Sequence, residues 1–377
     1  MVIFGSIRLF FTNRWVMMIK KIVIISVLTA LLGQSVPLLP VNAQSPNVLA
    51  MHYYEDLSKS HWAAKDLVQL IEMGVLDGPT NGKIKPNEMV SRAETIAVIA
   101  RATGVSLESN FPLKAKDVPV SHPYYKEIRK MAELGVIHDD AWMYPGEPVQ
   151  RDQISKILSL AFKIEIDQKN KASFIDIPKK HWAKDYVESL ADTGIIKGVT
   201  TKEFSPRTNV TRAQLAQLTM RGIQFTEQLS NYNLVYDYLA KDYITTTSVH
   251  KNWSNLVVKY INEIRVSKGL NPLTQDPALN QLAIIKAQDM IKRRYFDHTS
   301  PFYGDPWDMA TLFDYEYVSF AENLARNFKT PEQTVDAWLA SPSHRKNLLN
   351  AHYTTTGIGV KQANDGNLYI VNLFAKK

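Results

Sequence analysis

The sequence predicts a multidomain protein in which an all-α bundle of three similar repeats precedes an α+β domain. Two observations predict this architecture. One sequence pattern recurs three times in the first part of the 377-residue chain, and helix-like segments followed by a strand hairpin fill the last third. With 45% hydrophobic residues, the chain can bury cores of ordinary size. Its length favours two or three compact units.

Residues 1–43 have the features of an export signal. A positive start, MMIKK, precedes the apolar run Ile22–Leu32, and small residues at Val41–Ala43 offer a cleavage site before Gln44. Met17 and Met18 are alternative starts of translation. Because the apolar run is short for a bilayer span of about 20 residues, we expect a cleaved signal rather than an uncleaved anchor, and no membrane span after cleavage.

The formal charge of +7 overstates how basic the exported protein is. Of the 44 Lys and Arg residues, four lie in residues 1–43, which carry no acid, so 40 bases face 37 acids in the rest of the chain. A net charge of about +3 does not indicate a nucleic-acid partner. The chain has no Cys, so an exported form depends on its cores rather than on disulfides.

Each repeat shares an Asp, a His, a Gly and an Arg. Each aspartate precedes its histidine by five positions, and each histidine precedes its glycine by 13. The three sets are Asp56, His61, Gly74 and Arg92; Asp117, His122, Gly135 and Arg151; and Asp176, His181, Gly194 and Arg212. Repeats of this size are usually packed units with a shared core, and we place them at 53–104, 115–164 and 172–225.

Two helices are expected in each repeat. The first ends at the glycine, which favours the left-handed conformation that follows many helices. The second begins at a capping box, SRAE at 91–94 and TRAQ at 211–214. The middle copy has QRDQ at 150–153 instead. Gln150 is a poor cap, so this helix start is expected to be less well fixed.

The repeats resemble S-layer homology (SLH) repeats in the aspartate, the HWA of the first and third copies, the glycine and the TRAE-like motif. The resemblance implies a helical bundle that holds secondary cell-wall polysaccharide, often pyruvylated, of Gram-positive bacteria in grooves between repeats. It implies ligand-binding roles for residues that suit carboxylates and sugar faces: Arg92, Arg151, Arg212, Trp62 and Trp182. A guanidinium binds a carboxylate through two parallel hydrogen bonds, and a helix N-terminus favours anions. The alternative is solvated arginines and tryptophans in the core.

Residues 226–252 break the repeat pattern and are expected to be a partly ordered linker with at most one short helix.

The domain at 253–377 opens with an amphipathic helix that ends at Gly269. Two further helices begin with a capping residue followed by proline, at Asp276-Pro277 and Thr330-Pro331. Two strands around Asp365-Gly366 complete an α+β domain.

Four stretches of this domain resemble the CAP superfamily, which includes the cysteine-rich secretory, antigen 5 and pathogenesis-related 1 proteins. They are YFDHTSP (295–301), AENLA (321–325), WLASPSHRKNLLN (338–350) and HYTTTGIGV (352–360). The resemblance implies an α-β-α sandwich with an open cleft. In many members two His and two Glu line the cleft, and in some the histidines bind a divalent metal, usually zinc.

Three residues match that cleft: His298, Glu322 and His352. The second glutamate has no counterpart, and the bacterial SPxHR pattern adds His344 as a further candidate. His298 and His352, with Glu322 as ligand or orienting group, are suited to a zinc ion that would activate water. The alternative is a polar network that only holds loops together. The sequence has no GxSxG or HExxH motif to indicate another type of catalytic centre.

These features leave three functions open. The first is an exported surface protein, tethered to wall polysaccharide by the repeats, whose CAP domain binds an unidentified wall component, lipid or extracellular protein. The second is a tethered metal-dependent hydrolase that uses His298, Glu322 and His352. The third is a structural component of the surface coat.

Overall fold

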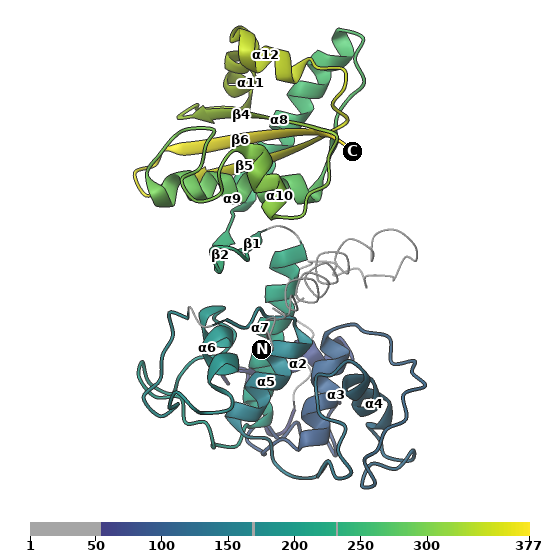
Figure 1. Cartoon of the computed structure of the whole chain (residues 1–377). Coiled ribbons are helices and arrows are strands. Elements are labelled where there is room, and N and C mark those ends of the chain that lie inside the picture. The colour runs from purple at the N-terminus through teal and green to yellow at the C-terminus, as the bar shows by residue number, and fades with distance from the viewer. Residues whose placement is uncertain (1–53, 168–169, 231–232) are drawn as a thin grey trace, which may run out of the picture. The chain divides into compact units, whose positions relative to one another are not determined.

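The structure, a computed structural model, describes residues 54–167, 170–230 and 233–377. The expected export signal lies outside these residues. The repeats contribute the helices α2 (Ala64–Glu72), α3 (Arg92–Ala102), α4 (Tyr125–Glu133), α5 (Arg151–Ala161), α6 (Lys184–Asp192) and α7 (Arg212–Ser230) (Figure 1).

Each repeat places two helices around one hydrophobic core. The first helix of each pair is followed by a glycine with positive φ, as predicted: 69° at Gly74, 70° at Gly135 and 78° at Gly194. The residue six positions after the repeated histidine is fully buried in the shared core in every copy. These residues are Leu67, Ile128 and Val187, each 0% exposed.

Backbone hydrogen bonds join the three repeats in a closed ring. The N–H of Val90 donates to the carbonyl of Val210, that of Val149 to Val90, and that of Val210 to Val149, at 3.0, 3.1 and 3.0 Å. All three valines are at most 1% exposed. Each repeat therefore gives one bond to one neighbour and receives one from the other, so the set closes on itself instead of forming an open row.

This closure also fixes the starts of the second helices. The N–H of Arg92 donates to Glu147, that of Arg151 to Thr208, and that of Arg212 to Glu88. The start of α5 is thus held by the neighbouring repeat, and the Gln153 side chain accepts the Gln150 N–H at 3.0 Å. The expectation of a poorly fixed helix at Gln150 was wrong, because it considered only local capping.

In the predicted linker after α7, the chain forms a hairpin, which the sequence analysis did not predict. Strands β1 (Leu234–Asp237) and β2 (Asp242–Thr245) pair antiparallel. Helix α8 (Ser248–Ser267) then begins before the predicted boundary at 253, with the Thr247 side chain accepting the His250 N–H at 3.2 Å. In the first turn of α8 the apolar residue Val249 is 68% exposed and flanked by polar residues, so apolar spacing did not reveal this turn.

The C-terminal domain contains a four-stranded sheet in the order β3-β5-β6-β4. The strands are β3 (Thr274–Gln275), β4 (Ser319–Arg326), β5 (Thr355–Gln362) and β6 (Leu368–Lys376). Strands β5 and β6 form the hairpin predicted around Asp365-Gly366, with Gln362 opposite Leu368. Strand β4 pairs antiparallel with the outer side of β6 and carries the AENLA stretch.

Helices cover both faces of this sheet (Figure 1). Helices α9 (Pro277–Arg293) and α10 (Pro306–Leu312) lie on one side, and α8, α11 (Pro331–Ala340) and α12 (Pro342–Leu348) lie on the other. Each side has its own core. Leu279 and Leu373 belong to the first core, and Val257 and Trp338 belong to the second.

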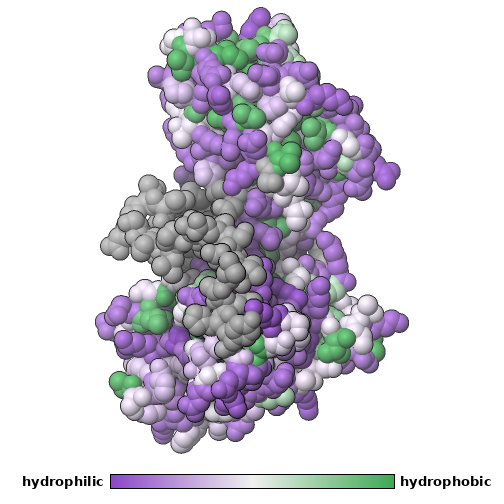
Figure 2. Space-filling view, turned by 180° about the vertical axis from the view of Figure 1, so that it is seen from behind, coloured by the Kyte–Doolittle hydropathy of each residue, from purple (hydrophilic) through white to green (hydrophobic). Residues whose placement is uncertain are grey.

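None of the helices in the described part of the chain has the length and apolar character that a bilayer span requires. The face seen in Figure 2 is mainly hydrophilic, with hydrophobic side chains in small separate patches. Among the residues that the structure describes, four tryptophans are more than half exposed: Trp62, Trp142, Trp182 and Trp307. Trp62 and Trp182 are therefore not core residues.

Candidate functional site

The repeated aspartate of each SLH-like copy holds a loop. Each carboxylate accepts the N–H groups of two consecutive residues ahead of the second helix. The pairs are Ile84 and Lys85 for Asp56, Met143 and Tyr144 for Asp117, and Phe204 and Ser205 for Asp176. The second residue of each pair has a positive φ, between 55° and 59°, which non-glycine residues rarely adopt. The presence of an aspartate at this position of each repeat is thus explained by its structural role in holding the loop.

The three repeated arginines differ in what their guanidinium groups contact. Arg151 is 9% exposed and donates to the carbonyls of Phe204 and Lys197 at 2.9 and 2.7 Å. Its guanidinium also lies 4.5 Å from the centre of the Phe204 ring. Burial lowers the pKa of Arg151. This side chain joins the second repeat to the third.

Arg212 joins the third repeat to the first. Its guanidinium pairs with the Glu94 carboxylate and donates to the Asp77 carbonyl at 2.6 Å. Burial raises the pKa of Glu94, and the positive charge of Arg212 opposes that effect. Glu94 belongs to the SRAE capping box, so Arg212 forms an ion pair with a carboxylate that the sequence analysis assigned to a helix cap.

Arg92 is the arginine of this set without such a partner. Its Nε is buried and makes no hydrogen bond, and no side-chain bond joins its guanidinium to a described residue. Arg151 and Arg212 bond the carbonyls of Lys197 and Asp77, but the corresponding carbonyl, that of His138, receives no bond from Arg92. The side chain instead lines an open groove.

We call this hollow, of about 420 Å³, the Arg92 groove. Its walls combine apolar Ile96, Val136 and Ile157 with aromatic Trp142, Tyr144 and Trp182 and with His138, Asp140 and Lys156. The Lys156 Nζ lies 3.0 Å from the His138 Nε2. Because a lysine ammonium only donates, the His138 Nε2 is the acceptor of this hydrogen bond.

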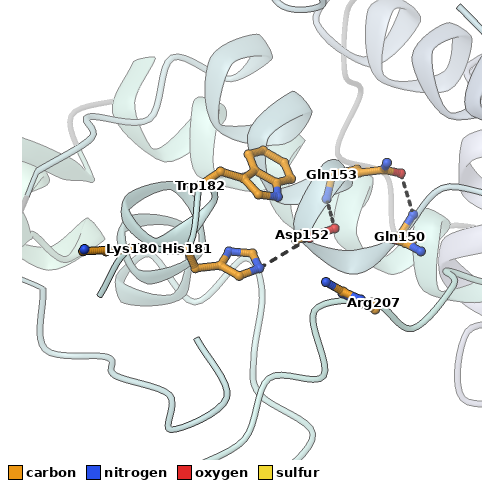
Figure 3. Close-up of a pocket in the computed structure, with 7 residues that line it drawn as sticks. All are labelled: Gln150, Asp152, Gln153, Lys180, His181, Trp182 and Arg207. Carbon is orange, nitrogen blue, oxygen red and sulfur yellow. Dashed lines mark hydrogen bonds and ion pairs between the residues drawn. The ribbon is translucent and has the colours of Figure 1, made fainter. Parts of the chain in front are cut away.

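A second hollow adjoins the first. It has a volume of about 510 Å³ and shares Gln153 and Trp182 with the Arg92 groove, and we call it the Trp182 hollow. Figure 3 shows Trp182 and Arg207 on either side of the contact between His181 and Asp152, whose side chains are 3.8 Å apart. Burial raises the pKa of Asp152. Lys180 and Arg207 supply exposed positive charge.

Helix N-termini do not add an anion site here. The N–H groups of Arg92 and Ala93 donate to the carbonyls of Glu147 and Pro145, and the Ser91 side chain accepts the Glu94 N–H. The first amides of α3 are therefore already used. Any attraction for anions in the Arg92 groove comes from side-chain cations and not from the helix end.

In the C-terminal domain, the structure brings together two of the residues predicted for the cleft. The Nδ1 of His298 lies 2.8 Å from the Glu322 Oε1. The Glu322 side chain is 2% exposed and that of His298 is 52% exposed. The hydrogen bond to Glu322 raises the pKa of His298, whereas burial raises the pKa of Glu322. The bond fixes the imidazole and leaves its Nε2 for a ligand.

A buried lysine supports the loop that carries His298. Lys286 on α9 is 1% exposed, and its Nζ donates to the His298 carbonyl at 2.6 Å and to the Tyr295 hydroxyl at 3.1 Å. Burial lowers its pKa, and the negative charge of Glu322 acts against this. The sequence contained a signal for this residue, because Lys286 occurs at helical spacing among the buried residues Ala283, Ala287 and Met290.

The two other histidines are placed differently. The His344 carbonyl accepts the Asn323 side-chain N–H at 3.1 Å, and Asn347 on the same helix bonds the Asn323 Oδ1 at 2.8 Å. The start of α12 thus lies beside the residue that follows Glu322. The pKa of His344 is lowered by burial and then by the positive charge of His298. No hydrogen bond joins the imidazole of His352 to a described residue.

These residues do not assemble an evident metal centre. Across residues 54–167, 170–230 and 233–377, no three His, Asp or Glu side chains are grouped as metal ligands. His298 and Glu322 form a histidine–carboxylate pair, but the expected second ligand, His352, is not joined to it. A metal held by His298 and His352 is therefore left as a prediction of the sequence resemblance.

Comparisons with known proteins agree with both resemblances. A model described as the cysteine-rich secretory protein family (CAP) matches residues 258–374. A model described as the S-layer homology domain matches residues 53–96 and 173–216, with the middle copy between the two ranges.

Two curated relatives match different parts of the chain. The uncharacterized protein YkwD of Bacillus subtilis (strain 168) is 44% identical over 118 residues, which are 30% of this chain and 46% of YkwD. The surface-layer 125 kDa protein of Lysinibacillus sphaericus is 31% identical over 176 residues, which are 45% of this chain and 15% of that protein. The chain thus spans less than half the length of either relative.

Among solved structures, an extracellular protein containing a SCP domain from Bacillus anthracis str. Ames has 23% identity and a TM-score of 0.32, and the match covers 40% of this chain and 50% of that one. The family matches and the residues described above show that the chain carries S-layer homology domains followed by a CAP domain.

Proposed function

We propose that this protein is held at the cell surface by an anionic wall polysaccharide that binds in the Arg92 groove and the adjoining Trp182 hollow. The observation that carries the proposal is the unpaired guanidinium of Arg92 beside exposed Trp142 and Trp182. Its counterparts, Arg151 and Arg212, are bonded within the bundle and act mainly as links between repeats.

The chemistry of the two hollows suits such a polymer. Arg92 offers two parallel N–H groups to a carboxylate, such as that of a pyruvate ketal. Lys180 and Arg207 extend the positive charge into the second hollow. Exposed tryptophan rings provide flat apolar faces on which sugars stack. The S-layer homology domains and the surface-layer relative indicate a location at the cell surface.

Binding of the full chain to purified walls tests this function. Arg92→Ala and Trp182→Ala should each weaken retention at least tenfold, because each removes a charged or stacking contact. Arg92→Lys should restore only part of the binding, since lysine lacks the two-pronged geometry. Trp307→Ala is the matched control: Trp307 is 52% exposed, lines neither hollow and is not among the residues predicted to bind the polysaccharide.

Melting temperatures distinguish an arginine that binds the polysaccharide from an arginine that joins two repeats. Arg92→Ala should leave the melting temperature unchanged, whereas Arg151→Ala should lower it because two carbonyl groups lose their donor. Wild-type retention of both Arg92→Ala and Trp182→Ala would remove this proposal.

On this proposal, the tether displays the CAP domain in the wall, where His298, oriented by the buried Glu322, contacts an unidentified ligand. A hydrolase is the second candidate, favoured by the hydrogen bond that orients the exposed imidazole. Hydrolysis of peptidoglycan, peptide or ester substrates that Glu322→Gln abolishes would support it. Absence of turnover in the wild-type protein, with and without added zinc, would argue against the hydrolase and favour a ligand-binding role of the CAP domain.

A further inference from the structure

An arginine on β4, the strand that carries Glu322, is held by two aromatic rings and pairs with no carboxylate of the described residues. The guanidinium carbon of Arg326 lies 4.9 Å from the centre of the Phe296 ring and 5.9 Å from that of Tyr369. The two rings meet edge to face, with centres 6.1 Å apart. Arg326 is exposed, and no ion pair or side-chain hydrogen bond joins it to another described residue. Its N–H groups are therefore free to bind a ligand.

This cluster and the His298–Glu322 pair form one strip along β4. Glu322 and Arg326 are four residues apart on the strand, so their side chains lie on the same face, about 13 Å apart along the chain. Phe296 contacts Arg326, and two residues later His298 bonds Glu322. Tyr369 lies directly opposite Arg326 on β6. The strip therefore has a cation at one end and an imidazole at the other.

The groups on this strip suit a sugar that carries a carboxylate. Stacking on the two rings positions the guanidinium, which presents its N–H groups in a fork that matches a carboxylate. Phe296 is 39% exposed, so part of its ring is available to the apolar face of a sugar. Asp297, the acid between Phe296 and His298, is turned into its own loop and accepts the Thr299 N–H at 2.9 Å.

We propose that Phe296, His298, Arg326 and Tyr369 form a binding site for an acidic glycan on the CAP domain. The carboxylate pairs with Arg326, the sugar ring packs on Phe296, and a neighbouring hydroxyl reaches the Nε2 of His298. This site uses none of the residues of the Arg92 groove, so it does not depend on the proposed tether. Its position on the face of the sheet, and not along the free edge of β4, favours a glycan over an extended peptide.

The test uses the full chain with Arg92→Ala, which weakens binding in the Arg92 groove, and it reads binding from signals of the CAP domain. The probes are N-acetylmuramic acid and N-acetylglucosamine, which share a ring and differ by a carboxylate-bearing lactyl group. NMR titration should show saturable shifts of the Phe296 and Tyr369 ring signals with N-acetylmuramic acid, and at least tenfold weaker binding of N-acetylglucosamine. Adding Arg326→Ala should weaken N-acetylmuramic acid binding at least tenfold.

The matched control is Lys329→Ala, which removes an exposed positive charge three residues from Arg326 and should leave the affinity for N-acetylmuramic acid unchanged.

A pyruvylated monosaccharide as a third probe identifies the source of the glycan ligand. Tighter binding than that of N-acetylmuramic acid points to wall polysaccharide, and weaker binding points to peptidoglycan. Equal binding of the two N-acetyl sugars, or an unchanged affinity in a folded Arg326→Ala variant, would overturn the site. Equally tight binding of free lactate or of an acidic dipeptide would overturn the assignment to a glycan.

Discussion

Asp176 shows how one carboxylate fixes a turn in the third repeat. It accepts the N–H groups of Phe204 and Ser205 at 2.8 and 2.6 Å, and Ser205 has a φ of 58°. Asp176→Ala should lower the free energy of unfolding by about 1–2 kcal/mol in urea titrations, because both bonds are lost. Glu203→Ala, an exposed acid in the same loop, is the control and should have little effect.

The effect of Asp176 should depend on pH. Burial acts to raise its pKa, but the backbone N–H bonds outweigh burial, and the pKa lies below the usual 3.8. A lowered pKa means that the stabilisation is complete above that value and is lost as the pH falls through the folded-state pKa. The difference between wild type and Asp176→Ala should therefore shrink on acidification below about pH 3.8. A constant difference down to the lowest pH would contradict the assigned role.

The protonation state of His298 offers a second test at this scale. Its hydrogen bond with Glu322 raises the pKa above 6.5, and burial acts in the opposite direction. We expect Glu322→Gln to bring the pKa to 6.5 or below in an NMR titration, because burial remains after the charge is removed. Stabilisation by protonated His298 should be present below pH 6.5 and fade as the pH rises through the raised pKa. A His298 pKa that is the same in wild type and Glu322→Gln would refute the coupling.

The sequence predicted residue types at the sites better than it predicted their contacts. Arg92, Arg151 and Arg212 are equivalent in the pattern, yet their partners are set by side chains of the next repeat, such as Glu94 and Phe204. Local spacing carries no information about those partners. Glu322 was matched to His298 through the family resemblance, and the structure joins them.

At the scale of elements, the N-capping residues were predicted well because capping is local. Asp276 accepts the N–H groups of Ala278 and Leu279, and Thr330 accepts that of Gln333. Strand β4, in contrast, was not assigned from its sequence, SFAENLAR, which does not alternate apolar and polar residues. Helices cover both faces of its sheet, and such strands lack the period that marks a half-exposed strand.

The contact between β5 and α9 depends on two glycines on one face of the strand. A Cβ at Gly359 would overlap the backbone of Ala283, and a Cβ at Gly357 would overlap that of Leu279. Gly359→Ala should therefore lower the free energy of unfolding by about 1–3 kcal/mol, since the helix must move away from the sheet. Gly146→Ala, whose Cβ would meet no atom within 4 Å, is the matched control in thermal unfolding. Equal melting temperatures for the two variants would show that the contact is not close.

At the scale of the whole molecule, the order of the repeats and the C-terminal domain was readable from the sequence, but the closure of the repeats was not. The middle copy departs from the side-chain pattern at Gln150 and lacks the HWA motif, yet Val149 makes the same ring bonds as Val90 and Val210. Those bonds use backbone atoms. A repeat can therefore lose sequence likeness and keep its place in the ring.

A closed ring predicts that the three repeats unfold together. Ile128 is 0% exposed in the middle repeat, and Ile128→Ala should cost about 2–5 kcal/mol. If the ring is one cooperative unit, hydrogen exchange at the amides of Val90, Val149 and Val210 should accelerate by a similar factor, at least tenfold. Leu282→Ala, in a core of the CAP domain, is the control and should leave these three amides protected. Faster exchange at Val149 alone, with Val90 and Val210 unchanged, would mean that the repeats open independently and that the ring bonds do not couple them.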